Sequence, residues 1–400
     1  MRILENYQLC IAINNRFRNL QSAGKCGFPA AFANTDIAAF HGSLPTYTPT
    51  PLFSLPGLAR RLGIRELWVK DESERFGLKA FKALGATYAV YRHLIRSGRV
   101  TPDSLYSPDN LSIPQSMTLC TATDGNHGRA VAWAAKLFGQ RAVIFMPQGT
   151  VPARIRNIEA EGAEVRIVGG NYDLAVKTAA EQSAANGWHV IADTAYPGYE
   201  LIPDDIMAGY LTLFREINDQ IPADNNTPPF DIVFLQGGVG SFAAAGAQYY
   251  FNTYGEKSPR LIVVEPTAAA CLMASAASPD GALTTSGGMD ATIMAGLNCP
   301  TPSLTAWPIL KHLVDVFLAI PDRFAREAMR LLYYPAREDR RIISGESGAA
   351  GLAGLCALLS EDSLAEARRA VGLSEDSRVL IISTEGDTDP INYNRIVTDE

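Results

Sequence analysis

A lysine at the start of an apolar segment is the first residue whose position suggests chemistry. Lys82 follows a strand-like run, Leu67–Lys70, and a polar turn, and it opens a pattern of helical spacing over residues 80–96. In the first turn of a helix it would lie at the positive end of the dipole, and burial beside Phe81 and Leu84 would disfavour its ammonium form. Such an amine suits Schiff-base chemistry. The plainer alternative is a solvated surface lysine.

Two glycine-containing segments also stand between a strand-like run and a helix-like run. In Gly237-Gly-Val-Gly-Ser241 the N–H groups can converge on an anion at a helix N-terminus, and a phosphate fits such a cradle. A purely structural turn is the alternative, and the GxGxxG spacing of dinucleotide-binding enzymes is absent. Asp124-Gly-Asn-His-Gly128 has the same context, in which Asp124 or Asn126 could simply cap the helix. We expect His127 to be a packing residue.

The elements that must position these residues are strands and helices in alternation. Between residues 118 and 194 this alternation predicts parallel βαβ units. The expected strands are 118–121, 142–146, 164–167 and 189–192, and the expected helices are 128–138, 151–161 and 172–186. A second sheet is expected from strands 66–70, 231–236, 260–265 and 378–383, with helices 56–62, 203–220 and 242–250. Asp193 then lies at the end of a strand, where parallel α/β sheets bind ligands.

Composition limits the partners. The 400 residues carry a net charge of −7 and a pI of about 5.4, which argues against nucleic acid or an anionic membrane as partner. No apolar run reaches the ~18 residues that span a bilayer. The five histidines are too scattered for a zinc site, so we expect no metal. Six cysteines without CxxC pairs predict buried free thiols in a cytoplasmic protein, with pairing of Cys271 and Cys299 as a minor alternative.

Four motifs occur in one order along the chain: Ala80-Phe-Lys-Ala-Leu-Gly85, Thr123-Asp-Gly-Asn-His-Gly128, Gln236-Gly-Gly-Val-Gly-Ser241 and Ser383-Thr-Glu-Gly386. This order resembles the tryptophan synthase β-like (fold type II) pyridoxal-phosphate enzymes. Further details resemble the diaminopropionate ammonia-lyase branch of that family. These details are Arg75-Phe-Gly-Leu78, Asp124, Asp193-Thr-Ala195, Thr292–Leu297 and the run Ser383–Pro390.

The resemblance implies an α/β fold with two open, mostly parallel sheets flanked by helices and the cofactor in the cleft between two domains. The large, cofactor-binding domain would comprise residues 1–85 plus 206–400, and the smaller domain 86–205. It also implies pyridoxal 5'-phosphate as cofactor and a homodimer. The cofactor-binding residues would be Phe81, Lys82, Asn126, Gly237, Gly238, Val239, Gly240, Ser241 and Thr384.

Within that family, Asn126 would bind the phenolic oxygen of the cofactor. Thr384, rather than its neighbour Ser383, would meet the pyridine nitrogen. A neutral hydroxyl there leaves the nitrogen largely unprotonated, which favours prompt β-elimination over transamination. Glu346 lies in a segment that departs from the family spacing, so we assign it no role.

Asp124 stands where related dehydratases and racemases carry a serine, on the ring face opposite Lys82. A carboxylate there could remove an α-proton that Lys82 cannot reach, so the site would accept both L and D substrates. Asp193 supplies a second carboxylate, unless it serves only in a structural salt bridge. Two carboxylates suit a substrate whose leaving group is an ammonium. We therefore take Lys82, Asp124 and Asp193 as catalytic.

The predicted reaction is the α,β-elimination of 2,3-diaminopropionate, in the L and D forms, to pyruvate and two ammonia. A serine/threonine dehydratase is an alternative. So is a β-replacement enzyme, in which a second nucleophile captures aminoacrylate. A third alternative, from another class, is a protein that binds the cofactor without turnover.

Overall fold

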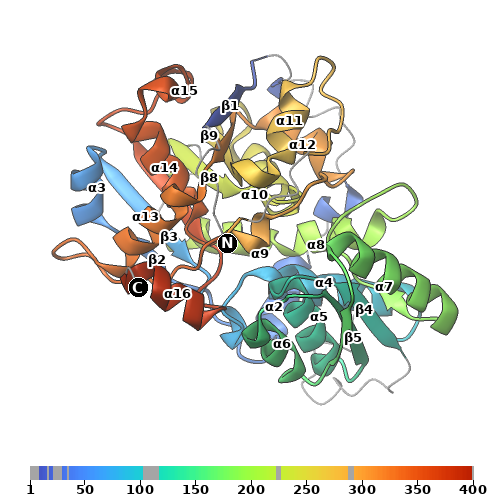
Figure 1. Ribbon diagram of the computed structural model, residues 1–400. Coiled ribbons are helices and arrows are strands. Elements are labelled where there is room, and N and C mark those ends of the chain that lie inside the picture. The colour runs from blue at the N-terminus through green and yellow to red at the C-terminus, as the bar shows by residue number, and fades with distance from the viewer. Residues whose placement is uncertain are drawn as a thin grey trace.

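Two sheets of different size organise the computed structural model, which describes residues 9–15, 18–20, 29–33, 36–101, 117–221, 227–286 and 292–398 (Figure 1). The larger sheet has the order β1-β10-β9-β8-β11-β3-β2, and only its edge strands β1 and β2 are antiparallel to their neighbours. Its strands are β1 Cys10–Ile13, β2 Leu52–Ser54, β3 Glu66–Asp71, β8 Ile232–Gln236, β9 Arg260–Pro266, β10 Val316–Ile320 and β11 Arg378–Ser383. The α/β fold with mostly parallel sheets is confirmed.

The smaller sheet is entirely parallel, with the order β6-β5-β4-β7. Its strands are β4 Thr118–Ala122, β5 Arg141–Pro147, β6 Glu164–Val168 and β7 His189–Val190. Its helices are α5 Asn126–Leu137, α6 Pro152–Glu159 and α7 Tyr172–Asn186. The predicted βαβ units are confirmed, although β7 ends two residues earlier than expected. The domain boundaries at residues 85 and 205 stay a prediction.

The larger sheet is buried on both faces, as the continuous apolar runs of its central strands require. Side chains alternate along β8: Val233 and Leu235 join one hydrophobic core, whereas Ile232 and Phe234 join the other. The first core contains α4 Lys82–Arg96, α8 Leu201–Gly209, α9 Leu211–Gln220, α10 Ser241–Tyr254 and α12 Ala306–Leu313. The second contains α3 Pro56–Leu62, α13 Asp322–Tyr333, α14 Ala350–Ser360, α15 Ala365–Val371 and α16 Pro390–Thr398. The first core also includes α5, so it continues under the smaller sheet.

Helix α4 joins the two sheets, because it packs against α5 on one side and α8 on the other (Figure 1). One helix was expected over 203–220, but the chain forms α8 and α9 with a break at Tyr210. Tyr210 keeps helical backbone angles, so the break leaves the apolar spacing intact and the sequence does not reveal it. The buried Tyr210 ring packs against Phe81, next to Lys82.

Other elements had no prediction. They are β1, β2, β10, α2 Ile37–Ser43, α11 Cys271–Ala277 and α12 to α16, together with the 3₁₀ turns Ala30–Ala33, Arg75–Gly77, Gly255–Lys257, Thr267–Ala269, Ala295–Leu297 and Asp362–Leu364. Within the described ranges, no helix combines the length and apolarity that a membrane crossing needs.

Candidate active site

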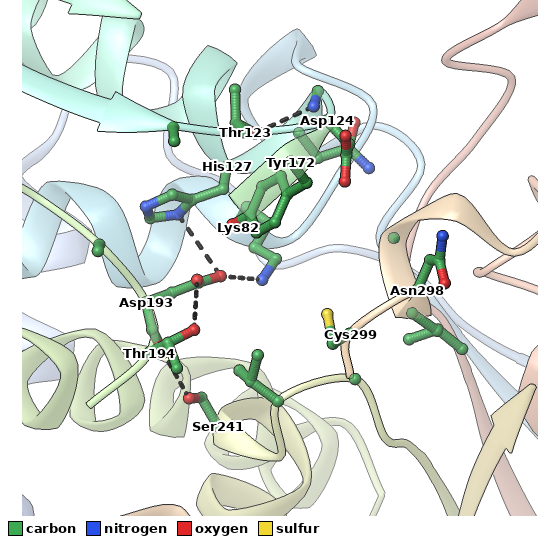
Figure 2. A pocket seen from close by; sticks show the side chains of 18 of the residues that line it. Lys82, Thr123, Asp124, His127, Tyr172, Asp193, Thr194, Ser241, Asn298 and Cys299 are labelled. Atoms are coloured by element: carbon green, nitrogen blue, oxygen red, sulfur yellow. Dashed lines mark hydrogen bonds and ion pairs between the residues drawn. The ribbon is translucent and has the colours of Figure 1, made fainter. Parts of the chain in front are cut away.

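A cavity of about 320 Å³ lies where the ends of β4, β7, β8 and β11 converge (Figure 2). The segments that follow these four strands supply most of its predicted residues, as expected for parallel α/β sheets. Those that line it are Phe81, Lys82, Asp124, Asn126, Asp193, Gly237, Gly238, Val239, Ser241 and Thr384. Gly240 is the one predicted site residue that does not line the cavity. Residues from both sheets and from α4 therefore meet in one place.

Lys82 is the first residue of α4, and its Nζ lies 2.6 Å from Asp193 Oδ2 (Figure 2). Burial is the largest single influence and disfavours the ammonium, but the charge and hydrogen bond of Asp193, together with Tyr210 and Cys299, raise the pKa of Lys82 above its ordinary value. The expectation of a disfavoured ammonium is therefore wrong for this ion pair. For Asp193, burial likewise opposes ionisation, but the combined effects of Lys82, His127 and a backbone hydrogen bond hold the pKa of Asp193 below its ordinary value. Asp193 therefore does form a salt bridge, and its partner is Lys82, which also lines the cavity.

The neighbouring Lys79 is directed elsewhere. Its Nζ lies 2.6 Å from Asp387 Oδ1, its side chain is 40% exposed, and it does not line the cavity. Its backbone has φ 58°, which is unusual for a residue other than glycine. The backbone N–H of Phe81 donates to the carbonyl of Thr384 at 3.2 Å, which ties the start of α4 to the end of β11. These constraints leave Lys82 as the lysine of this segment that points into the cavity.

The helix α5 is capped by Thr123. Its Oγ1 accepts from the N–H groups of Gly125 at 3.0 Å and Gly128 at 3.1 Å. The capping alternatives for Asp124 and Asn126 are therefore wrong. Asn126 is the first residue of α5, and its amide donates to Glu385 Oε2.

The Asp124 carboxylate forms no ion pair with a described residue, and burial raises its pKa although the charge of Arg154 opposes the shift. Nη1 of Arg154 donates to the Asp124 carbonyl at 3.3 Å. Asp124 thus contributes a partly buried carboxylate that forms no ion pair with a described residue. Figure 2 places it near Tyr172 and apart from the Lys82–Asp193 pair.

The glycine loop before α10 has the shape of an anion cradle. Gly240 has φ 98°, and a Cβ at Gly237 would lie 2.4 Å from Glu265 Cγ, so this backbone path excludes larger residues. The first N–H groups of α10 have no partner within the helix and can face an anion. The Ser241 hydroxyl donates to the Asp193 carbonyl at 2.9 Å, which joins this loop to the segment after β7. An anion cradle and a buried amine in one cavity fit a phosphorylated aldehyde such as pyridoxal phosphate.

Thr384 is buried and lines the cavity, whereas the Ser383 hydroxyl donates to Ser344 Oγ at 2.9 Å and does not line it. This difference supports the choice of Thr384 over Ser383 as the hydroxyl that would meet the pyridine nitrogen. Glu385 also lines the cavity and accepts from the Ser347 N–H at 3.0 Å through Oε1. Glu346 is buried outside the cavity lining, where Asn392 donates to it at 2.5 Å, and burial raises its pKa to about 7.

Sequence reasoning missed several residues that line the cavity, namely Arg154, Tyr172, Tyr196, Asn298, Ser347 and Glu385. Glu385 lies inside one of the four motifs, and Ser347 follows Glu346 in the segment that departs from the family spacing, so those segments were the available signals. The other four stand in no recognisable pattern. Cys299 also lines the cavity. Both Cys299 and Cys271 are free thiols, so the alternative that these two cysteines pair is wrong. Among the described residues, no group of three or more His, Cys, Asp or Glu is arranged to hold a metal.

Comparisons with known proteins agree with this site. The family model "Pyridoxal-phosphate dependent enzyme" matches residues 44–385. Diaminopropionate ammonia-lyase of Salmonella typhimurium is 42% identical over 368 residues, which cover 90% of this chain and 91% of that protein. A biosynthetic L-threonine dehydratase of Haemophilus influenzae is 30% identical over 76% of this chain and 52% of its own length.

Solved structures give the same result. Two crystal structures of the Escherichia coli diaminopropionate ammonia lyase match with TM-scores of 0.86 and 38% identity over 98% of this chain and 97% and 98% of theirs. One is a complex with D-serine and the other a complex with an aminoacrylate-PLP azomethine reaction intermediate. The chain therefore belongs to the fold type II pyridoxal-phosphate dependent enzymes, in the family of the diaminopropionate ammonia-lyases.

Proposed function

We propose that this enzyme eliminates ammonia from 2,3-diaminopropionate, in both the L and D forms, and yields pyruvate and a second ammonia. The observation that carries the proposal is the presence of two separate carboxylates, Asp124 and Asp193, in one cavity with Lys82. The names of the relatives support the substrate, and the D-serine complex of the Escherichia coli enzyme supports a site that admits D amino acids.

Pyridoxal phosphate, when bound, supplies an electron sink for the negative charge that develops at the substrate α-carbon. We assign its phosphate to the loop Gly237–Ser241 and its aldehyde to the amine of Lys82. Phe81 and Asn126 would contact its ring, and Thr384 would accompany its nitrogen. The described geometry supports these assignments because all of these residues except Gly240 line the same cavity.

Lys82 and Asp124 would act as the two bases. Each removes the α-proton from one face of the substrate, so chirality decides which of the two acts. The separation of Asp124 from the Lys82–Asp193 pair supports two independent bases (Figure 2). The raised pKa of Asp124 supports the role, because a carboxylate that holds a proton more strongly is the better base.

Asp193 would bind the β-ammonium of the substrate. It already holds one ammonium, that of Lys82, at 2.6 Å in a largely buried position. A β-ammonium leaves as neutral ammonia when its carbon–nitrogen bond breaks, so a carboxylate that keeps it protonated favours departure. A hydroxyl leaving group gains nothing from this contact. The remaining enamine then hydrolyses to pyruvate and the second ammonia.

The test is pyruvate release, by a coupled assay, from cofactor-loaded enzyme with L- and D-2,3-diaminopropionate beside L- and D-serine and L-threonine. We expect fast turnover of both diaminopropionate enantiomers and slow turnover of the hydroxy amino acids. A preference for serine or threonine would change the assignment to dehydration. An amino-acid adduct in place of pyruvate, when a second nucleophile is added, would change it to β-replacement.

We also infer a cytoplasmic homodimer. Free thiols at Cys120, Cys271, Cys299 and Cys356 support a reducing compartment. The dimer is supported by the family resemblance alone. Light scattering on the purified enzyme tests it, and a mass near 43.2 kDa, that of one chain, would contradict it.

A further inference from the structure

His127 has one ring nitrogen committed and one available. Its Nε2 lies 2.8 Å from the carbonyl of Ile191, and because a carbonyl only accepts, Nε2 carries a proton whether the ring is neutral or charged. The other nitrogen, Nδ1, is buried and has no hydrogen-bond partner among the described residues. It lies 3.8 Å from Asp193 Oδ2 (Figure 2). Nδ1 is therefore the atom at which this ring gains or loses its proton.

Asp193 Oδ2 stands between two nitrogens, Lys82 Nζ at 2.6 Å and His127 Nδ1 at 3.8 Å. While Lys82 is an ammonium, it neutralises the carboxylate and the ring remains uncharged. Burial lowers the pKa of His127, and the positive charge of Lys82 lowers it further, although Asp193 acts in the opposite direction. The three groups then carry one positive and one negative charge.

This balance fails when the Lys82 amine is uncharged, as it must be to accept an α-proton. Unless a substrate brings a second ammonium to Asp193, this largely buried carboxylate would then have no cation, which is strongly unfavourable. The other titratable groups that interact with Asp193 in the described part of the chain are Tyr172, Tyr199, Tyr210 and Cys299. Burial raises the pKa of all four, so they stay neutral and offer no positive charge. His127 is the remaining base that faces Asp193.

We propose that His127 binds a proton at Nδ1 and becomes the counter-ion of Asp193 when the amine of Lys82 is uncharged and no substrate ammonium lies at Asp193. One N–H bond is lost at Lys82 and one is formed at His127, so the net charge of the three residues stays at zero. Lys82 can then act as a base without leaving Asp193 unpaired. His127 is thus a positioning residue for charge, and its role is needed in the substrate-free site and with a substrate that brings no β-ammonium to Asp193.

The experiment is a histidine titration by ¹⁵N NMR on the full chain without cofactor. The wild type is compared with Lys82→Met, and the His127 signal is assigned by its loss in His127→Gln. We expect the pKa of His127 to rise by at least about one unit in Lys82→Met, which is a tenfold gain in proton affinity. In the matched double variant Lys82→Met/Asp193→Asn the rise should disappear. An unchanged pKa, or a rise that persists without the carboxylate, would overturn the proposal; Lys82→Gln replaces Lys82→Met if that variant does not fold.

A second measurement separates charge compensation from a structural role. In cofactor-loaded His127→Gln, the pH profile of kcat for serine, which brings no β-ammonium to Asp193, should shift to higher pH on the limb that requires uncharged Lys82. The shift is expected for the serine enantiomer whose α-proton Lys82 removes. The shift is expected because deprotonation of Lys82 would then leave Asp193 without a counter-ion. A lower kcat with an unshifted profile would mean that His127 only packs. The NMR titration needs no substrate, so it can fail or succeed independently of the proposed function.

Discussion

Two ion clusters involve the two ends of the segment between β3 and α4, and they differ in how completely their charges are satisfied. The first contains Lys70, Glu72, Arg75 and Glu216. Arg75 is 1% exposed and donates to Glu72 at 2.8 Å and to Glu216 at 2.7 Å, while Lys70 Nζ donates to Glu216 Oε2 at 2.7 Å. Two cations thus meet two anions, and none of the four residues lines the cavity of the candidate active site.

The second cluster contains Lys82, Asp193 and His127, with Asp124 nearby. Here a single short ion pair is present, Nδ1 of His127 has no hydrogen-bond partner among the described residues, and the Asp124 carboxylate has no ion pair with them. All four residues line the cavity. The comparison indicates that a saturated network fixes the backbone of the segment, whereas incompletely paired charges remain available to bind and to exchange protons.

The largest effect should come from removing the amine at the cavity. Lys82→Ala deletes the covalent anchor of the cofactor and one of the two proposed bases, so activity should fall by roughly 10⁴-fold or more, the upper range for loss of one acid–base group. The yellow absorbance of the bound cofactor should disappear as well. Lys79→Ala is the matched control, because Lys79 pairs with Asp387 outside the cavity. If Lys79→Ala, and not Lys82→Ala, bleaches the protein, the assignment of Lys82 fails.

Breaking the saturated cluster should instead affect stability. Glu216→Gln leaves Lys70 and Arg75 with one fewer buried anion, and removal of one partner of a buried ion pair costs about 3–5 kcal/mol. Chemical denaturation should show this loss, while the folded fraction keeps its elimination rate. Arg215→Gln on the same helix is the control, because its ion pair with Asp219 is exposed. Activity lost without a change in unfolding free energy would contradict the structural role of this cluster.

The two clusters also show how far the sequence could be interpreted. Lys82, the glycine loop and Asp124 were predicted because each lies in a short motif, in which a few consecutive residues define a strand–turn–helix context and carry the resemblance to the family. The Lys82–Asp193 pair joins residues 111 positions apart, and Arg75 and Glu216 are 141 positions apart. No local pattern encodes such pairs, which explains why the pKa of Lys82 was expected to change in the wrong direction.

The same distinction holds for the fold. Parallel strands separated by amphipathic helices were predicted almost to the residue, whereas β1 and β10 were not predicted. β1 is an edge strand that pairs only with β10, which lies about 300 residues later in the chain. In this pairing Cys10 is opposite Ala319. Helix α14 is buried on nearly every side, so it lacks the polar face that gives a helical period. His127 is predicted from the sequence to be a packing residue, because its approach to Asp193 arises only when the ends of β4 and β7 come together.

Within the cavity cluster, Asp124→Asn should lower activity on one substrate enantiomer far more than on the other. If Asp124 is a base for one face only, kcat/KM for one enantiomer should fall by about 10²-fold or more, the lower range for loss of a general base, and the other should change little. Asp193→Asn is the informative comparison, since loss of the proposed ammonium site should weaken both enantiomers. An equal loss on both enantiomers in Asp124→Asn would show that this carboxylate does not discriminate between the two faces.

The smallest expected effect concerns Thr384, which contributes an uncharged hydroxyl to the cavity. Thr384→Asp places a carboxylate where a buried hydroxyl lines the cavity, and an anion beside the cofactor nitrogen would favour its protonated form. Elimination should slow by about tenfold, which is a change of roughly 1.4 kcal/mol in the barrier, and a long-wavelength absorbing species should accumulate during turnover. Thr384→Ser keeps the hydroxyl and should retain both rate and spectrum. If Thr384→Asp leaves spectrum and rate unchanged while Asp124→Asn and Asp193→Asn act as expected, Thr384 does not contact the ring nitrogen, and the electron sink is controlled by another residue of the cavity.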